Sequence, residues 1–298
     1  MDSGFASDSG KYDPVGDRVP GNLTDYVFSM NGFVDVLGVV ETGLWGDGGD
    51  GVPSKEEIAK SWGFEYIHVR SNCAFMSHKE MKVVEEPSEG SSTIVAEVDD
   101  ITYIVTFMSA NSYASKWEDF KALSDLVMRY QDRPLVLMGD LNSISPMDSV
   151  RYNETLLCGN GTYNADEQSG EYVINFCLED ESSGDWKLDF KPMATLLNNT
   201  DLTDLCFLQG GFYDVDSDGL GQYSQCGFSN PTLLIHMTGD YGYDRGSHGH
   251  DHAMAKIDYI LANKKMLETN RFHHSTVLRS FQADGASDHY PIEATFLD

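Results

Sequence analysis

Residues 134–149 read PLVLMGDLNSISPMDS, an apolar strand followed at once by polar side chains. Residues 134–138 have the composition of a buried β-strand. Asp140 and Asn142 then stand two positions apart, so in an extended chain their side chains point to the same side. Two explanations fit: a turn, in which Asp and Asn are common, or a site for a metal ion and a phosphate group at a strand end. Whether similar polar residues occur at the ends of other strands distinguishes these two explanations.

The composition describes a globular chain with a strong negative charge. Its 298 residues are 41% hydrophobic, enough for one large domain or two small ones. No apolar run approaches the roughly 20 residues of a membrane-spanning helix, so we expect no membrane span. The net charge of −28 repels polyanions and disfavours a long grip on nucleic acid. Solubility or a saline habitat would also explain the charge, and a bound cation would reverse it locally.

Apolar periodicity predicts interleaved helices and strands. Residues 21–34 carry a helical apolar stripe that includes Phe33, and Ser-x-x-Glu capping boxes at Ser54 and Ser115 predict two more helices. Because hairpins also occur, we expect an α/β fold with mixed sheets. The expected strands are 35–40, 64–69, 73–77, 93–98, 101–107, 134–138, 256–262, 276–281 and 290–296.

The domain organisation follows from where this pattern begins and weakens. Residues 1–20 are polar, and we expect them to be a disordered or truncated N-terminal segment. Residues 21–298 are expected to form one domain, with long loops at about 150–250 where Gly, Asp, Asn and Ser dominate.

Polar residues recur at the ends of the predicted strands. Glu41 closes the strand 35–40, Asp258 interrupts the apolar run KIDYIL, and Asp288 and His289 precede the last strand. Each of these residues alone is common at a solvated strand end. Their joint occurrence is uncommon, because a carboxylate such as Asp258 inside an apolar strand needs a partner. The joint pattern favours a site.

The motifs VVET, MGDLNS, KIDYIL and SDHYPI resemble, in order and spacing, those of the endonuclease/exonuclease/phosphatase superfamily with the DNase-I-like fold. The resemblance covers roughly residues 17–296. It implies a four-layer sandwich, in which two mixed β-sheets face each other with helices outside. It also implies a cleft lined by the loops at one end of the sheets.

The resemblance also assigns roles to the strand-end residues. Glu41 and Asp288 would bind Mg²⁺ or Mn²⁺, with Ca²⁺ also possible, because these cations prefer hard oxygen ligands. His289, held by Asp258 through its other ring nitrogen, would activate or stabilise the attacking water. The remaining roles are water orientation by Asp140, a phosphate contact or metal ligation by Asn142, and a phosphate contact by Asn111.

Two features depart from the family pattern. The family's opening strand, which ends in a metal-liganding Asn, is expected before the helix 21–34, yet the residues ahead of it contain no apolar strand. Met108 stands where the family carries a catalytic His or Tyr, and a thioether cannot protonate a leaving group. Either another group supplies the proton, or the leaving group needs none, or catalysis is weak.

We therefore expect a divalent-metal-dependent hydrolase of phosphate esters, a phosphodiesterase or phosphatase with a water nucleophile. The charge favours a small or lipid-like ester over duplex nucleic acid. The alternatives are a deoxyribonuclease-like endonuclease and a non-catalytic binding module. The sequence leaves the oligomeric state open.

The cysteines and sequons favour an extracellular, glycosylated protein. Cys158, Cys177, Cys206 and Cys226 fall in the irregular segment, where disulfides would be useful, and no C-x-x-C pair indicates structural zinc. N-x-T sequons occur at Asn22, Asn153, Asn160 and Asn198.

Overall fold

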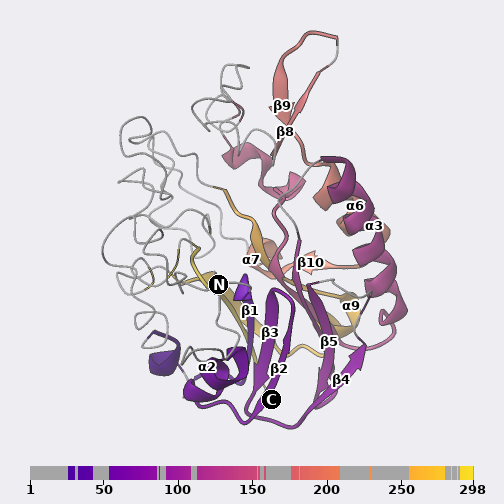
Figure 1. The fold of residues 1–298 in the computed structure, drawn as a ribbon. Coiled ribbons are helices and arrows are strands. Elements are labelled where there is room, and N and C mark those ends of the chain that lie inside the picture. Colours follow the sequence, from indigo (N-terminus) through magenta and orange to yellow (C-terminus); the bar gives the residue numbers. More distant parts are fainter. Residues whose placement is uncertain are drawn as a thin grey trace, which may run out of the picture.

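The structure is a computed structural model, and its elements form two β-layers with helices outside them (Figure 1). It describes residues 26–30, 33–42, 54–85, 87, 92–108, 113–152, 154, 158, 176–180, 182–208, 229, 255–278, 283, 287 and 289–297. The predicted N-terminal segment 1–20 and much of 150–250 lie outside this part of the chain.

The first layer is a six-stranded sheet in the order β10-β11-β7-β6-β5-β4. Only β6 and β7 pair in parallel, so the sheet is mixed, as predicted. The crossover between β6 and β7 is the helix α3, Tyr113–Arg129. The strands are β4 (Met81–Glu85), β5 (Thr93–Val98), β6 (Ile101–Phe107), β7 (Leu135–Asp140), β10 (Thr203–Asp204) and β11 (Asp258–Ala262).

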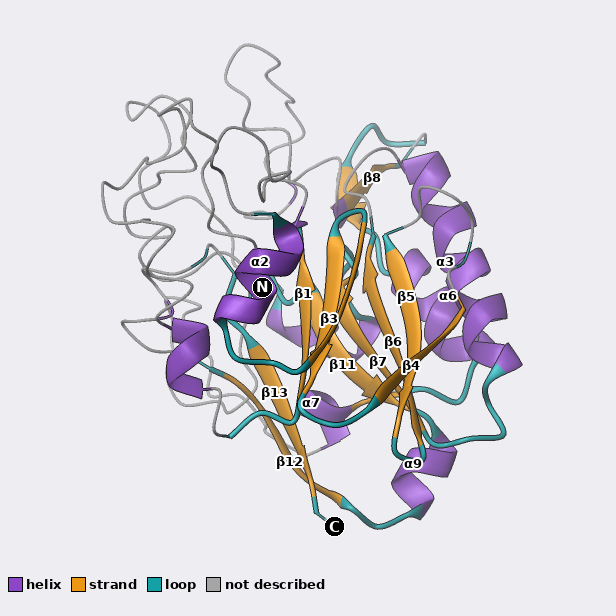
Figure 2. Cartoon of the chain, turned by 60° about the horizontal axis from the view of Figure 1, so that its bottom comes forward, coloured by secondary structure: helices purple, strands orange, loops and turns teal. Residues whose placement is uncertain are grey.

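The second layer consists of an antiparallel sheet in the order β1-β3-β2 and a separate hairpin, β12–β13. It packs directly on the first layer. A Cβ added at Gly38 in β1 would lie 2.9 Å from the Met138 sulfur and 3.1 Å from Val105, so a larger residue at this position would displace side chains of the first layer. Figure 2 shows the two layers. The strands are β1 (Val36–Val40), β2 (Tyr66–Arg70), β3 (Cys73–Ser77), β12 (Phe272–Val277) and β13 (Ile292–Phe296).

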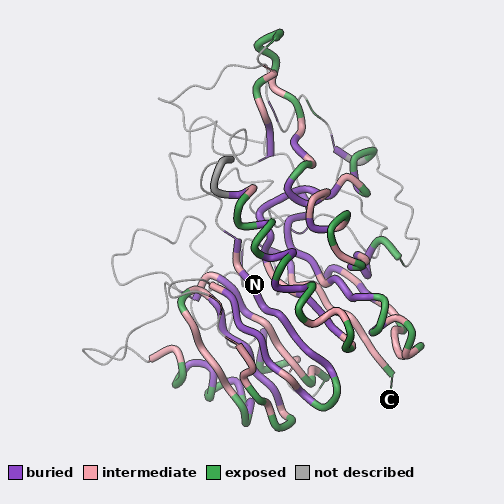
Figure 3. The backbone as a smooth tube through the Cα atoms, turned by 90° about the vertical axis from the view of Figure 1, so that its right-hand side faces the viewer, coloured by how far each residue is buried: buried purple, intermediate pink, exposed green. Residues whose placement is uncertain are grey.

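Helices cover both outer faces, which confirms the four-layer α/β sandwich. On the first layer, α3 packs beside α6 (Lys191–Asn199), with Phe120 and Leu196 in one core cluster with Leu137. On the second, α2 (Lys55–Ser61) buries Ile58, and Trp62 at its end is buried as well. Figure 3 shows buried backbone running along the strands and exposed turns at the surface. The smaller elements are α7 (Leu205–Leu208), α9 (Lys264–Glu268), the hairpin β8 (Cys177–Glu179) and β9 (Trp186–Leu188), and a 3₁₀ helix at Pro146–Arg151.

Some local predictions are wrong in detail. Phe33 is 90% exposed rather than part of a buried stripe, because the described helix spans only residues 26–30. Ser115 lies inside α3 rather than before it, because the helix already begins at Tyr113. The last hairpin starts earlier than predicted, because β12 begins at Phe272 rather than at residue 276. His273 lies in a β-bulge, and the polar residues there interrupt the apolar pattern from which the strand was predicted. No helix in the described ranges is long and apolar enough to cross a membrane.

Candidate active site

β7 and β11 place two carboxylates opposite each other. The strands pair antiparallel with Asp140 directly across from Asp258, and both residues are buried. Asp258 Oδ2 lies 2.9 Å from Nδ1 of His289, which precedes β13. One potential metal-binding atom from each of the three residues lies within 4.8 Å of those of the other two. The structure thus brings together Asp140, Asp258 and His289, residues that are far apart in the sequence.

Asn142 follows β7 in a left-handed conformation, with φ of 45°. Its backbone amide donates to Asp140 Oδ1 (2.7 Å), which closes a local turn. Its side-chain nitrogen donates both to Asp140 Oδ2 (2.7 Å) and to the Met108 carbonyl (2.8 Å). Both N–H groups of the Asn142 side chain therefore donate to other groups of the chain. The side-chain oxygen remains to contact a ligand, and an oxygen acceptor binds a cation better than a phosphate.

Three solved structures resemble the fold of this chain over most of its length. An AP endonuclease from Archaeoglobus fulgidus has a TM-score of 0.56 at 16% identity, covering 93% of this chain and 95% of that one. The 3'-5' exonuclease NExo from Neisseria meningitidis has a TM-score of 0.54 at 17% identity, covering 93% and 95%. The chain has the DNase-I-like fold. A singly substituted 3' phosphatase NExo from Neisseria, bound to a product DNA hairpin, gives 0.51 at 18%, covering 91% and 93%.

Sequence comparisons add nothing to this likeness. No family model matches the chain, and no curated protein matches it. The DNase-I-like fold is therefore visible in the arrangement of the elements at a level of identity where sequence comparison finds no relative.

Within this DNase-I-like fold, the other predicted residues have different outcomes. Glu41 directly follows β1 with φ of 59°, and its charge is one of the causes that raise the pKa of Asp140, so it acts on the same site. Asp288 and Asn111 lie outside the described residues, and their predicted roles stay predictions. Met108 is buried at the end of β6 and its amide donates to the Asp140 carbonyl (2.9 Å), so no proton donor stands at this position.

The two paired carboxylates have opposite electrostatic settings. Burial, and then the charges of Asp258 and Glu41, raise the pKa of Asp140 above its ordinary value. Burial would also raise the pKa of Asp258, but the charge and hydrogen bond of His289 outweigh it and lower this pKa. The charge of His289 also acts on Asp140, but it does not outweigh burial and the neighbouring carboxylates, so Asp140 remains short of positive charge. A divalent cation would supply that charge, and the oxygen-rich donor set fits Mg²⁺ or Mn²⁺.

Lys116 supports the site and carried no signal in the sequence. It is buried in α3, and its Nζ donates to the backbone carbonyl of Asn142 (2.7 Å). Burial lowers its pKa to about 8, while the charges of Asp140 and Asp189 act in the opposite direction. A lysine in an amphipathic helix is usually on the surface, so no local pattern distinguishes this one.

Ser229 is a second supporting residue that sequence reasoning missed. Its hydroxyl accepts hydrogen bonds from the amides of Ile257 and Asp258 (both 3.1 Å). Its carbonyl accepts from the amide of Tyr290 (2.7 Å), the residue after His289. Ser229 therefore joins the segment that carries Asp258 to the one that carries His289. It lies in the irregular part of the sequence, where periodicity gives no guide.

Proposed function

We propose that this protein hydrolyses phosphate esters, using a water nucleophile and a divalent cation, Mg²⁺ or Mn²⁺. The observation that carries the proposal is the buried group of Asp140, Asp258 and His289 at the strand ends of a DNase-I-like fold. A buried His–carboxylate pair beside a further carboxylate is suited to moving a proton from water.

Asp258 and His289 would carry out the proton transfer. The 2.9 Å contact to Asp258 Oδ2 fixes the imidazole through Nδ1. Nε2 then becomes the ring nitrogen that exchanges a proton with the reacting water, and the negative charge of Asp258 stabilises the imidazolium that forms. Asp140, held by Asn142 through two hydrogen bonds of 2.7 Å, would orient the water.

The cation would be held by the oxygen donors around Asp140. Glu41, the side-chain oxygen of Asn142 and, from the sequence, Asp288 are the proposed ligands. A bound divalent cation polarises a phosphoryl oxygen and offsets charge on the leaving group. Since Met108 cannot donate a proton, we expect the protein to favour esters with acidic leaving groups.

The test uses bis(4-nitrophenyl) phosphate, whose leaving group needs no protonation. Wild-type protein should hydrolyse it with Mg²⁺ or Mn²⁺ and stop in excess EDTA. His289→Ala should lower kcat about 10²- to 10⁴-fold, the usual contribution of a general base. His273→Ala, at an exposed histidine on β12, is the matched control and should keep full activity. A protein that is inactive with every divalent cation would overturn the proposal.

A second candidate is a nuclease, favoured by the likeness to an AP endonuclease and a 3'-5' exonuclease. The net charge of −28 favours a small or lipid-like ester instead, because a duplex would be repelled. Plasmid DNA in the same assay separates the two. Nicking that is faster than diester hydrolysis and fades steeply with salt would favour the nuclease.

We also propose an extracellular location. A disulfide joins Cys158 to Cys177, and Cys206 is disulfide-bonded as well, whereas Cys73 is a buried free thiol. Such bonds persist in oxidising compartments, which supports secretion. Immunodetection in culture supernatant against washed cells of the source organism tests this, and exclusive retention in cytosol would contradict it.

A further inference from the structure

Lys116 is a buried lysine in the first turn of α3 that faces the backbone of the turn after β7. Its Nζ donates to the Asn142 carbonyl (2.7 Å) and lies 5.8 Å from the centre of the Phe176 ring. An ammonium group loses its hydration when it is buried, so a protein retains one in its interior only where strong partners compensate. The partners of Lys116 therefore indicate what it does.

The charge of Lys116 does not explain its position. Burial lowers the pKa of Lys116, whereas the charges of Asp140 and Asp189 raise it, so both carboxylates lie near the ammonium group. The largest influences on the pKa of Asp140 are burial and then the charges of Asp258 and His289, so Lys116 is not its main counter-charge. A positive charge beside a site for a divalent cation also opposes binding of that cation.

The hydrogen bond to Asn142 does explain the position. Asn142 has a left-handed backbone with φ of 45°, a conformation that is unfavourable for most residues other than glycine. Its amide donates to Asp140 Oδ1 and its carbonyl accepts from Lys116, so both of its backbone polar groups are held. Because a hydrogen bond from an ammonium group is about twice as strong as a neutral one, Lys116 stabilises this backbone conformation.

The backbone conformation of Asn142 sets the direction of its side chain. The side-chain nitrogen donates to Asp140 Oδ2 and to the Met108 carbonyl, and the side-chain oxygen is a proposed ligand of the cation. A rotation of the backbone at this position would displace that oxygen. Mg²⁺ demands nearly ideal octahedral geometry, so a small displacement of one ligand weakens binding.

We propose that Lys116 is a positioning residue for the divalent cation, which fixes the backbone of Asn142 so that the side-chain oxygen is aimed at the cation. Its positive charge weakens binding, but the geometry that it imposes strengthens binding more. This role rests on the proposed function, because the cation belongs to that proposal. Lys116 would act through Asn142 rather than contact the cation itself.

The two effects of Lys116 on cation affinity have opposite signs. Lys116→Met keeps an unbranched side chain beside Phe176 but removes both the charge and the hydrogen-bond donor. If positioning dominates, this variant binds the cation about tenfold more weakly, as expected for the loss of a hydrogen bond from a charged donor. If the charge dominates, it binds the cation more tightly, because a repelling charge is removed. The direction of the change decides between the two effects.

Calorimetric titration with Mn²⁺ alone, without substrate, measures this affinity. The dissociation constant should rise about tenfold in Lys116→Met and stay within about threefold of wild type in Lys116→Arg, which keeps the donor and the charge. Lys121→Met, at an exposed position on α3, is the matched control and should leave the constant unchanged. An unchanged or lowered constant in Lys116→Met would overturn the proposal. If Lys116→Met fails to fold, a loss of about tenfold or more in Lys116→Arg would overturn it.

A double-mutant cycle tests whether Lys116 acts through Asn142. Asn142→Ala removes the proposed ligand oxygen, so adding Lys116→Met should weaken binding no further. It should instead strengthen binding slightly, because only the repulsion by the ammonium group is left to remove. A second loss of about tenfold in the Asn142→Ala background would show that Lys116 acts elsewhere, and would overturn the proposal.

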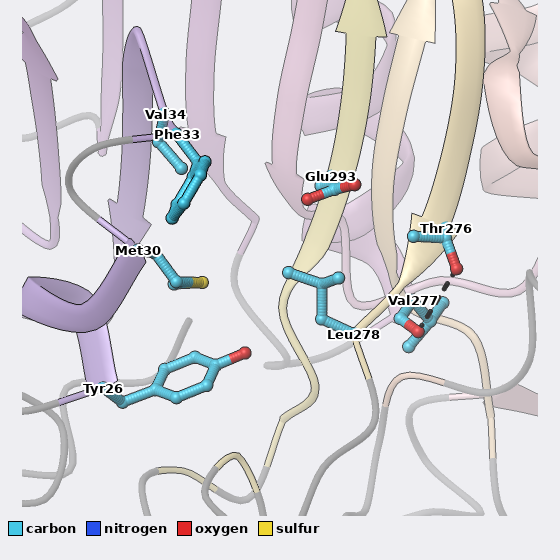
Figure 4. A pocket seen from close by; sticks show the side chains of 8 residues that line it. All are labelled: Tyr26, Met30, Phe33, Val34, Thr276, Val277, Leu278 and Glu293. Atoms are coloured by element: carbon cyan, nitrogen blue, oxygen red, sulfur yellow. Dashed lines mark hydrogen bonds between the residues drawn. The ribbon is translucent and has the colours of Figure 1, made fainter.

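A further control addresses cation binding away from the candidate site. A mostly apolar pocket of about 510 Å³ lies between the segment before β1 and the β12–β13 hairpin (Figure 4). Glu293 is the single charged side chain among the residues that line it, and none of these residues belongs to the candidate site. Glu293→Gln should leave the Mn²⁺ constant unchanged, and a weaker constant would overturn the assignment of the measured affinity to Asn142.

Cation affinity and hydrolysis are measured separately, so the two proposals can fail separately. If the variants bind Mn²⁺ in the predicted order but wild-type protein hydrolyses no diester, the proposed function is refuted and the role of Lys116 is supported. If wild-type protein hydrolyses the diester but Lys116→Met binds Mn²⁺ as tightly as wild type does, only the role of Lys116 is refuted.

Discussion

Asp140→Asn should stabilise the metal-free protein while it abolishes activity. Asp140 is buried opposite Asp258, and the charge of Asp258 is one of the causes that raise the pKa of Asp140. Sites that gather like charges for function commonly carry a stability cost of this kind. Asparagine has nearly the same shape as aspartate but removes the charge.

The magnitude follows from two opposing contributions. Potential ligand atoms of the two carboxylates lie within 4.8 Å of each other. At an effective dielectric constant of about 20, two unit charges at that separation repel by about 3 kcal/mol. Asparagine keeps an acceptor for the Asn142 amide but loses the charge-assisted bond from the Asn142 side chain, worth about 1.5 kcal/mol. The variant should therefore gain about 1–2 kcal/mol in the free energy of unfolding.

The pH dependence of this gain has a definite sign. The folded-state pKa of Asp140 is raised above 3.8, so the folded protein holds more protons than the unfolded chain between that value and the raised one. The wild-type free energy of unfolding therefore falls as pH rises through this window, and the variant lacks this fall. Below about pH 4 the repulsion is absent, and Asp140→Asn should be the less stable protein.

Urea unfolding followed by tryptophan fluorescence measures these differences. In EDTA at neutral pH the variant should unfold at higher urea than wild type. In millimolar Mg²⁺ the order should reverse, because the variant lacks the Asp140 charge beside the proposed ligands and the cation therefore binds and stabilises the wild type more strongly. Asp125→Asn, at an exposed position on α3, is the matched control and should change stability by less than about 0.5 kcal/mol. A variant less stable than wild type in EDTA at neutral pH would refute the reasoning.

Changes at three further places test the supporting structure. Ser229→Ala should cost about 1–3 kcal/mol, because two buried amides at the start of β11 lose their acceptor, and Ser229→Thr should restore most of it in the same urea assay. Replacing Cys158 and Cys177 together by serine should cost about 3 kcal/mol by opening a loop with a sequence separation of 19, and an unchanged urea midpoint would contradict this. Asn263→Ala removes three side-chain hydrogen bonds to the chain that leads into β7 and one that caps the start of α9, so a loss of about 3–4 kcal/mol is expected; a loss below about 1 kcal/mol by calorimetry would count against it.

Local patterns predicted elements well where the signal is itself local. The Ser54 capping box is confirmed by both of its bonds, Glu57 N to Ser54 Oγ (3.2 Å) and Ser54 N to Glu57 Oε2 (2.8 Å). The β5–β6 hairpin also forms where the two strand runs meet, with Asp99 at φ of 54° in its turn. Ser115 shows the limit, because the same spacing occurs inside α3 where the helix has already begun.

The candidate site could be predicted in part because strand ends combine local and tertiary signals. Asp140 and Asp258 stand out as carboxylates on apolar strands, but the register that places them opposite each other depends on the whole sheet. Lys116 and Ser229 act only through distant backbone groups, the carbonyl of Asn142 and the amides before β11. Such roles are created by packing, and no spacing in the sequence encodes them.

The stretch after β7 shows why its two explanations are not exclusive. The Asn142 amide bonds to Asp140 Oδ1 two residues earlier, so the chain does form a turn. That turn needs a left-handed backbone at Asn142, which asparagine tolerates. Lys116 Nζ stabilises the turn by donating a hydrogen bond to the backbone carbonyl of Asn142. In the same turn the side-chain nitrogen of Asn142 donates hydrogen bonds to Asp140 and to the Met108 carbonyl, so the side-chain oxygen remains as a possible ligand atom beside Asp140. A turn built from these two residues therefore assembles the oxygen donors that a hard cation requires.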